Sequence, residues 1–232
     1  MPKTTKTYEN ESLQLSVEEI KQLKADINGY STVLEMPVEL QLRLMNYYME
    51  SFEYVDIDGV MVSVVRQKTA AKSANEKAKY DAEYPLAKEL SSLGLSVYLF
   101  PENDKAIIYQ RRISDGAIGR AWLELKTATT KTSIKDAVRK GLAKCNILFL
   151  NIIRIPPRTA LKAITDQING SKDSIKYKDK LIVIGMNGKM EFAVKTNIKG
   201  LEQALGGGPR RITSLPDIHD SITSLFVNNQ AK

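Results

Sequence analysis

The chain has 232 residues, 43% of them hydrophobic and 26% charged, so it is long enough to bury a sizeable core, and its composition argues against wholesale disorder. Its 34 basic residues outnumber its 27 acidic ones, and the net charge of +7 suits either an anionic partner such as nucleic acid or a lysine-rich surface. One cysteine and one histidine exclude an intrachain disulfide and a structural zinc site. Any bound metal is therefore expected on carboxylate oxygens, as Mg²⁺, Mn²⁺ or Ca²⁺.

The amino terminus and the hydropathy of the chain set expectations for its location. Residues 1–6 lack the apolar core of a secretory signal, and no apolar run approaches the roughly 20 residues that a membrane-spanning helix needs. We therefore expect a cytoplasmic protein without membrane association, and the sequence leaves its oligomeric state open.

Residues 1–70 are expected to form a small N-terminal unit of helices and a hairpin. The apolar pattern predicts a helix over 13–27, with Ser16 as the N-cap of a capping box, and a second helix that begins at Pro37. Two apolar runs on either side of an Asp-Gly pair predict a β-hairpin over 54–65.

Residues 71–197 are expected to form a core of the α/β (α+β) class, in which helices flank a mixed central sheet. The expected elements are, in chain order, a helix ending near residue 93, strands over 95–100, 106–111 and 120–126, a helix over 133–145, a buried strand over 146–152, a helix over 156–168 and a hairpin over 180–195. Residues 198–232 are expected to form a peripheral tail, in which 218–226 favour a short helix.

The third of these short strands carries the best candidate for chemistry in the chain. Side chains alternate along a strand, so Trp122, Glu124 and Lys126 share one face. Leu123 and Leu125 share the other face and fit a hydrophobic core. A carboxylate and an ammonium group on a covered face are costly unless they pair with each other or bind a metal.

A second carboxylate, that of Asp115, lies in the turn before this strand and can swing back toward Glu124. Two carboxylates that converge on one point form a site for a hard cation. Lys126, on the same face as Glu124, can orient a water molecule or stabilise charge on a phosphate. These groups are the smallest set that metal-assisted hydrolysis of a phosphodiester requires.

The spacing of these residues resembles the signature of the PD-(D/E)xK nuclease superfamily. Asp115 is followed, after eight residues, by Glu124-Leu125-Lys126, and the helix, strands, helix and strand expected over 72–152 follow the order of that family. More narrowly, several segments resemble the nuclease toxin domains of contact-dependent inhibition proteins and related phage or mobile-element proteins. These segments are Leu95–Glu102, Trp122–Thr127, Ser133–Lys135, Lys140–Lys144 and Asn146–Ile152, and the resemblance covers roughly residues 72–195.

The resemblance implies a restriction-endonuclease-like core and a set of site residues. It implies metal-ligand roles for Asp115 and Glu124, with Mg²⁺ or Mn²⁺ as the cofactor. It implies a water-positioning or transition-state role for Lys126. The helix after the core strand often contributes a glutamine or lysine to the catalytic group, and Lys144 occupies that position here.

The helix before the strands often supplies a further glutamate ligand, for which Glu76 is the first choice and Glu83 the second. Basic residues around the site are candidates for contacts with a nucleic-acid backbone. These candidates are Arg111, Arg112, Arg120, Lys131, Arg139 and Lys140. For those on the helix, a solvated surface is an equally good interpretation.

The leading hypothesis from the sequence is a metal-dependent nuclease that hydrolyses phosphodiester bonds in DNA or RNA, of the toxin type or encoded by a phage or mobile element. An immunity protein or another partner would then be expected. Two alternatives stay open. One is a nucleic-acid-binding or structural protein on the same scaffold without catalysis, and the other is a ribonuclease that needs no metal.

Overall fold

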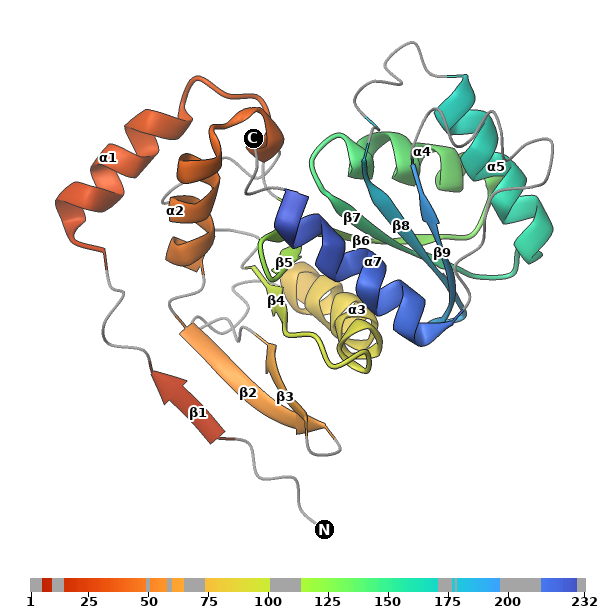
Figure 1. Cartoon of the computed structure of the whole chain (residues 1–232), viewed down its shortest axis with the longest axis horizontal. Helices are drawn as coiled ribbons and strands as arrows, with labels where there is room; N and C mark the ends of the chain where they lie inside the picture. Colours follow the sequence, from red (N-terminus) through yellow and green to blue (C-terminus); the bar gives the residue numbers. More distant parts are fainter. Residues whose placement is uncertain are drawn as a thin grey trace. The chain divides into compact units, whose positions relative to one another are not determined.

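The computed structural model describes residues 6–9, 15–48, 51–57, 60–64, 74–100, 114–170, 177, 179–196 and 214–228 (Figure 1). The chain divides into two compact units, Met1–Arg120 and Ala121–Lys232. The domain boundaries predicted from the sequence, near residues 70 and 197, lie outside the described residues and stay predictions.

A three-stranded antiparallel sheet of order β1-β2-β3 belongs to the first unit. Its strands are β1 (Lys6–Glu9), β2 (Ser51–Ile57) and β3 (Val60–Val64). β2 and β3 pair with Ile57 opposite Val60, which confirms the hairpin predicted for this part of the chain.

Two α-helices of the first unit, α1 (Val17–Ile27) and α2 (Val38–Tyr48), pack against each other, and a short 3-10 helix, η2 (Val33–Glu35), lies between them in sequence. The predicted capping box of α1 is confirmed, because the amide of Glu19 donates to Ser16 Oγ at 3.2 Å and the amide of Ser16 donates to Glu19 Oε2 at 2.7 Å. The start of α1 thus follows from a local sequence signal.

The first unit also contains α3 (Ala74–Ser91), β4 (Val97–Leu99) and β5 (Gly116–Ile118). The sequence predicts a turn around Asp115, but the structure shows that the next residue, Gly116, begins a strand. A Cβ atom on Gly116 would lie 2.0 Å from the carbonyl oxygen of Tyr98, so only glycine lets β4 and β5 pair this closely. The strand predicted over 106–111 lies outside the described residues.

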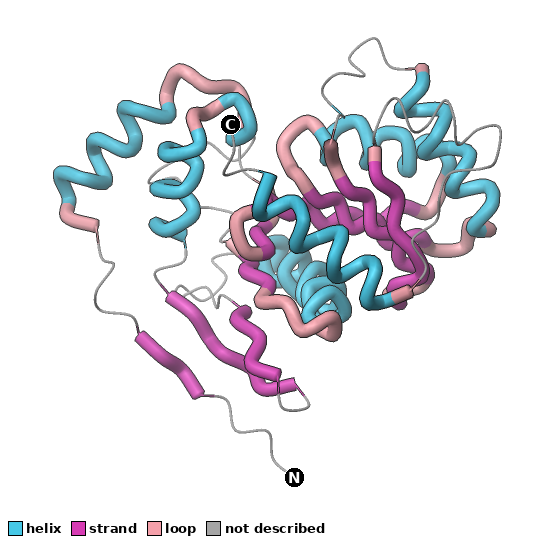
Figure 2. Tube along the Cα trace, in the orientation of Figure 1, coloured by secondary structure: helices cyan, strands magenta, loops and turns pink. Residues whose placement is uncertain are grey.

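The second unit alternates strands and helices along most of its length. Its elements are β6 (Ala121–Ala128), α4 (Lys131–Leu142), β7 (Ile147–Ile152), α5 (Pro157–Asn169), β8 (Leu181–Met186), β9 (Lys189–Lys195) and α7 (Leu215–Asn228). β6, β7 and β8 run parallel, and β9 is antiparallel to β8. Figure 2 shows these strands as the magenta part of this unit, with α4 and α5 side by side in cyan.

The larger sheet is mixed and its strands follow chain order, β4-β5-β6-β7-β8-β9. This arrangement confirms the predicted mixed sheet flanked by helices, in the α+β class. All six residues of β7 are buried, as expected for a continuous apolar strand that is covered on both faces. No helix among the described residues is both long and apolar enough to span a bilayer.

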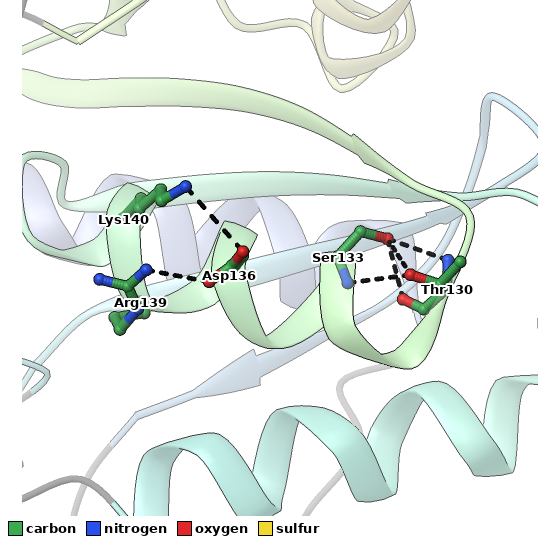
Figure 3. Close-up of polar contacts among 5 residues, drawn as sticks. All are labelled: Thr130, Ser133, Asp136, Arg139 and Lys140. Atoms are coloured by element: carbon green, nitrogen blue, oxygen red, sulfur yellow. Dashed lines mark hydrogen bonds and ion pairs between the residues drawn. The ribbon is translucent and has the colours of Figure 1, made fainter.

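Local turn chemistry explains two further features of the second unit. Asn187 and Gly188 join β8 to β9 with φ angles of 52° and 85°, the left-handed pair that a two-residue hairpin of type I′ requires. The buried side chain of Asn151 accepts a hydrogen bond from the Gly188 amide at 2.8 Å and holds this turn. α4 begins two residues earlier than predicted, with Thr130 as its N-cap and Ser133 completing a capping box (Figure 3).

Candidate active site

The candidate site lies on β6, on the face of that strand that α4 covers. The sequence predicts a hydrophobic core on the Leu125 side of β6, and the structure buries most of the Glu124 side as well. Gly141 of α4 explains the close cover, because a Cβ atom at this position would lie 2.9 Å from Leu148 Cδ1 and 3.6 Å from Glu124 Cγ. The helix can therefore approach the sheet directly above the Glu124 side chain.

Glu124 is the centre of this site, and its side chain has no exposed surface. Its Oε1 atom lies 2.5 Å from Nζ of Lys126 and 2.8 Å from Nζ of Lys144. The two lysine side chains are 29% and 19% exposed, so each joins a buried carboxylate to the protein surface. We call Glu124, Lys126 and Lys144 the Glu124 cluster.

The two lysines reach Glu124 from different elements. Lys126 follows it by two positions on β6 and therefore projects from the same face of the strand. Its Nζ also donates to the carbonyl oxygen of Leu125 at 3.2 Å. Lys144 lies in the short turn between α4 and β7, where its amide donates to the Gly141 carbonyl oxygen at 3.0 Å. The structure thus brings together three of the four residues predicted to be catalytic.

Asn146 fixes the level of this turn against β6. Its side-chain Oδ1 accepts a hydrogen bond from the Trp122 amide at 2.9 Å, and its own amide donates to the Trp122 carbonyl oxygen at the same distance. Beyond these bonds, β7 runs parallel to β6 with Leu148 opposite Glu124. The turn that carries Lys144 is therefore fixed to β6 at Trp122, two residues before Glu124.

The charges of the cluster decide what it can do chemically. With all three groups charged, two ammonium groups and one carboxylate leave one net positive charge at a nearly buried point. Lys126 and Lys144 offset the large cost of burying an ionised carboxylate. Carboxylate oxygens bind hard cations and ammonium groups bind phosphate, so the cluster can contact both parts of a metal–phosphate assembly.

The other predicted metal ligands belong to the first unit. Asp115 immediately precedes β5, where its carbonyl oxygen accepts a hydrogen bond from the Phe100 amide at 2.9 Å. Glu76 lies on α3, and its side chain lies outside the described part of the structure. Glu83, the second choice on that helix, is buried at 8% exposure. The predicted convergence of these carboxylates on Glu124 stays a prediction.

The Glu124 cluster offers a single carboxylate to Mg²⁺ or Mn²⁺, and a cation would have to compete with Lys126 and Lys144 for it. Magnesium is commonly held by one or two protein carboxylates, with water and substrate phosphate completing its coordination. Glu124 supplies one such carboxylate, but the two ammonium groups on its Oε1 give the cluster a net positive charge that opposes a cation until a lysine moves away. Across the described residues, no three side chains of His, Cys, Asp or Glu gather into a group that could hold a metal ion.

The predicted nucleic-acid contacts lie on exposed surfaces wherever they are described. Lys131 begins α4, and Arg139 and Lys140 lie in its last turns. The Asp136 carboxylate pairs with two of these residues, at 2.9 Å from Arg139 and 3.9 Å from Lys140 (Figure 3). The Arg139 hydrogen bond lowers the pKa of Asp136 below its usual range.

Of the other three basic candidates, only one lies among the described residues. Arg120 is exposed in the turn that follows β5. Arg111 and Arg112 lie outside the described residues, so their predicted contacts are not located.

Lys180 is a buried basic residue that no sequence pattern predicts. It immediately precedes β8, and its Nζ donates to the carbonyl oxygen of Leu142, the last residue of α4. Burial of the ammonium group lowers the pKa of Lys180 to about 8, and interaction with Cys145 acts in the opposite direction. A lysine at the start of an apolar run looks like an exposed flank, and no local signal identifies its partner 38 residues away.

This buried lysine gives the protein a predicted dependence of stability on pH. Its pKa is about 8 in the folded chain, against an ordinary value of 10.5, so between these values the unfolded chain binds the additional proton. The free energy of unfolding should therefore rise by up to about 3 kcal/mol from pH 8 to pH 10.5. Below pH 8 the full cost of burying the charged ammonium group of Lys180 remains.

Chemical denaturation of the wild type and of Lys180→Met, at a series of pH values across this window, measures the effect. Other ionisable groups such as Tyr177 and Asp179 are present in both proteins, so the difference between their unfolding free energies isolates Lys180. Lys195→Met, an exposed lysine at the end of β9, is the matched control and should show no such difference. Parallel pH curves for the wild type and Lys180→Met would contradict the prediction.

Comparison of the chain with protein-family models, with curated proteins and with solved structures finds no match.

Proposed function

We propose that this chain is a metal-dependent nuclease that hydrolyses phosphodiester bonds in nucleic acid at the Glu124 cluster. The observation that carries the proposal is a carboxylate with no exposed surface whose Oε1 lies within 2.8 Å of ammonium groups from two different elements. Apolar side chains of similar volume often stabilise a core as well as buried ions do. Charges retained at such a position therefore favour a functional role.

The residues of the cluster divide the proposed reaction between them. Glu124 would be the oxygen ligand for the cation, and Lys126, with its greater exposure, would contact the phosphate. Lys144 balances the carboxylate from the side of α4. The chemistry that a bound Mg²⁺ or Mn²⁺ would supply is polarisation of the phosphate and a lower pKa for the attacking water molecule.

The order of elements along the chain supports this proposal. α3, β4, β5 and β6 are followed by α4 and the parallel strand β7, which is the order that the family resemblance implies. The Glu-x-Lys pair lies on β6, and the exposed basic residues of α4 follow it along the chain. We place the reaction in the cytoplasm, where an inhibiting immunity protein is the proposed partner.

Incubation with three nucleic acids tests the proposal directly. Purified protein is mixed with transfer RNA, single-stranded DNA or duplex DNA, each with Mg²⁺, with Mn²⁺ or with EDTA. We expect cleavage of at least one substrate with a divalent cation and loss of that cleavage in EDTA. Salt-sensitive binding without turnover under any condition would instead identify a non-catalytic nucleic-acid-binding protein.

The EDTA arm separates the second candidate function, a ribonuclease that needs no metal. This candidate is favoured by the contact between a carboxylate and an ammonium group, which are the group types of a general base and of a cation that stabilises a phosphorane. Cleavage of transfer RNA that survives EDTA would select it and would remove the metal from the proposal.

A further inference from the structure

Lys180 is joined to the Glu124 cluster through the last turn of α4. The ammonium group of Lys180 donates to the carbonyl oxygen of Leu142. Lys144, whose own ammonium group contacts Glu124, lies two residues after Leu142. A single short segment, residues 141–144, therefore accepts a hydrogen bond from the residue before β8 and places the Lys144 ammonium group against Glu124 of β6.

The main chain of Lys180 is fixed, so its side chain starts from a defined point. Its amide donates to Thr196 Oγ1 at 3.0 Å, and its carbonyl oxygen accepts from the Thr196 amide at 2.8 Å. The Thr196 hydroxyl also donates to the carbonyl oxygen of Tyr177. These bonds tie the start of β8 to the end of β9, which gives Lys180 a rigid base.

The carbonyl of Leu142 is a position where an ammonium group has a specific effect. The last carbonyl groups of a helix have no partner within the helix, and the helix dipole gives this end a partial negative charge. A lysine that donates there satisfies one carbonyl and attracts the whole end of α4. Both effects hold residues 141–144 at a fixed distance from β8 and, through Gly141, close to Glu124.

We propose that Lys180 is a positioning residue for the Glu124 cluster, which holds the end of α4 so that Lys144 contacts Glu124. Lys180 does not itself touch the carboxylate in this role, and it acts through Leu142 and the turn that follows. The placement of Lys144 stands on the contacts above, whereas its consequence for cleavage rests on the proposed function. The alternative is a lysine that only caps α4, without effect on Lys144.

Competitive acylation of lysine side chains tests the proposal without using catalysis. The full-length protein reacts with a limiting amount of an amine-acylating reagent, and peptide mass spectrometry gives the labelling of Lys144 relative to Lys126. Both lysines contact the same oxygen atom, but only Lys144 is carried by the end of α4. Lys126 therefore serves as an internal reference.

In Lys180→Met we expect the ratio of Lys144 to Lys126 labelling to rise about fivefold, because the end of α4 loses the hydrogen bond at Leu142. This variant should fold, because it replaces a buried ammonium with an apolar side chain of similar length. Lys180→Gln, which keeps a neutral donor, should give a smaller rise in the same direction. Lys180→Arg should restore the wild-type ratio, and the exposed Lys195→Met should leave it unchanged.

Two results would overturn the proposal. One is a wild-type ratio in both Lys180→Met and Lys180→Gln, which would show that Lys144 is placed independently of Lys180. The other is an equal rise in labelling at Lys126 and Lys144, which would indicate general loosening of the unit. Because no cleavage is measured, a failure of the nuclease proposal leaves this test intact.

Discussion

The Glu124→Gln variant is expected to lose cleavage of nucleic acid by about a hundredfold or more, a loss of the size caused by removing one preorganised electrostatic contact from an active site. Glutamine has the same shape as glutamate but carries no charge, so it neither binds a hard cation well nor balances Lys126 and Lys144. Single-turnover rates with saturating Mg²⁺, measured on the substrate that the wild type cleaves, give the effect.

Glu191→Gln on β9 is the matched control for this experiment. Glu191 is an exposed glutamate on a strand of the same unit, so the same chemical change occurs away from the cluster. The control should cleave at the wild-type rate, and circular dichroism should show that both variants are folded. Cleavage by folded Glu124→Gln at the wild-type rate would remove Glu124 from the active site.

The double variant Lys126→Met/Lys144→Met is expected to have the largest effect on stability. It leaves the Glu124 carboxylate buried without either ammonium group, and breaking a buried ion pair in this way costs about 3–5 kcal/mol. The partial exposure of both lysines, 29% and 19%, places the expected loss at the lower end of that range. Denaturant unfolding at neutral pH measures the change in the free energy of unfolding.

A triple variant separates the charge effect from lost packing. Adding Glu124→Met to the two lysine changes removes the buried carboxylate, so most of the lost stability should return. The triple variant should also lack cleavage, because the reactive groups are gone. If the triple variant is as unstable as the double variant, packing rather than the buried charge holds this region together.

Much of the second unit could be predicted because its signals are local. The Asn187-Gly188 pair specifies the hairpin that joins β8 to β9, and the continuous apolar run of β7 indicates a strand covered on both faces. The common face of Glu124 and Lys126 follows from the alternation of side chains along a strand. These features depend on residues that are close together in the chain.

The features that could not be predicted depend on close approach between distant segments. β5 has only three residues, too few for any periodic pattern, and it exists because Gly116 lets β4 come near. The full burial of Glu124 depends on Gly141, whose lack of a side chain admits α4. The bond from Lys180 to Leu142 joins residues 38 apart, for which a single sequence contains no signal.

The complete burial of Glu124 also affects the time course of binding. A carboxylate with no exposed surface can be reached by a solute only after side chains around it move, and Lys126 and Lys144 are its partly exposed neighbours. The apparent affinity for a cation is then reduced by the fraction of time that this opened arrangement exists. In a rapid-mixing experiment, the observed rate of cation binding should level off at high cation concentration, at the rate at which the side chains around the carboxylate move.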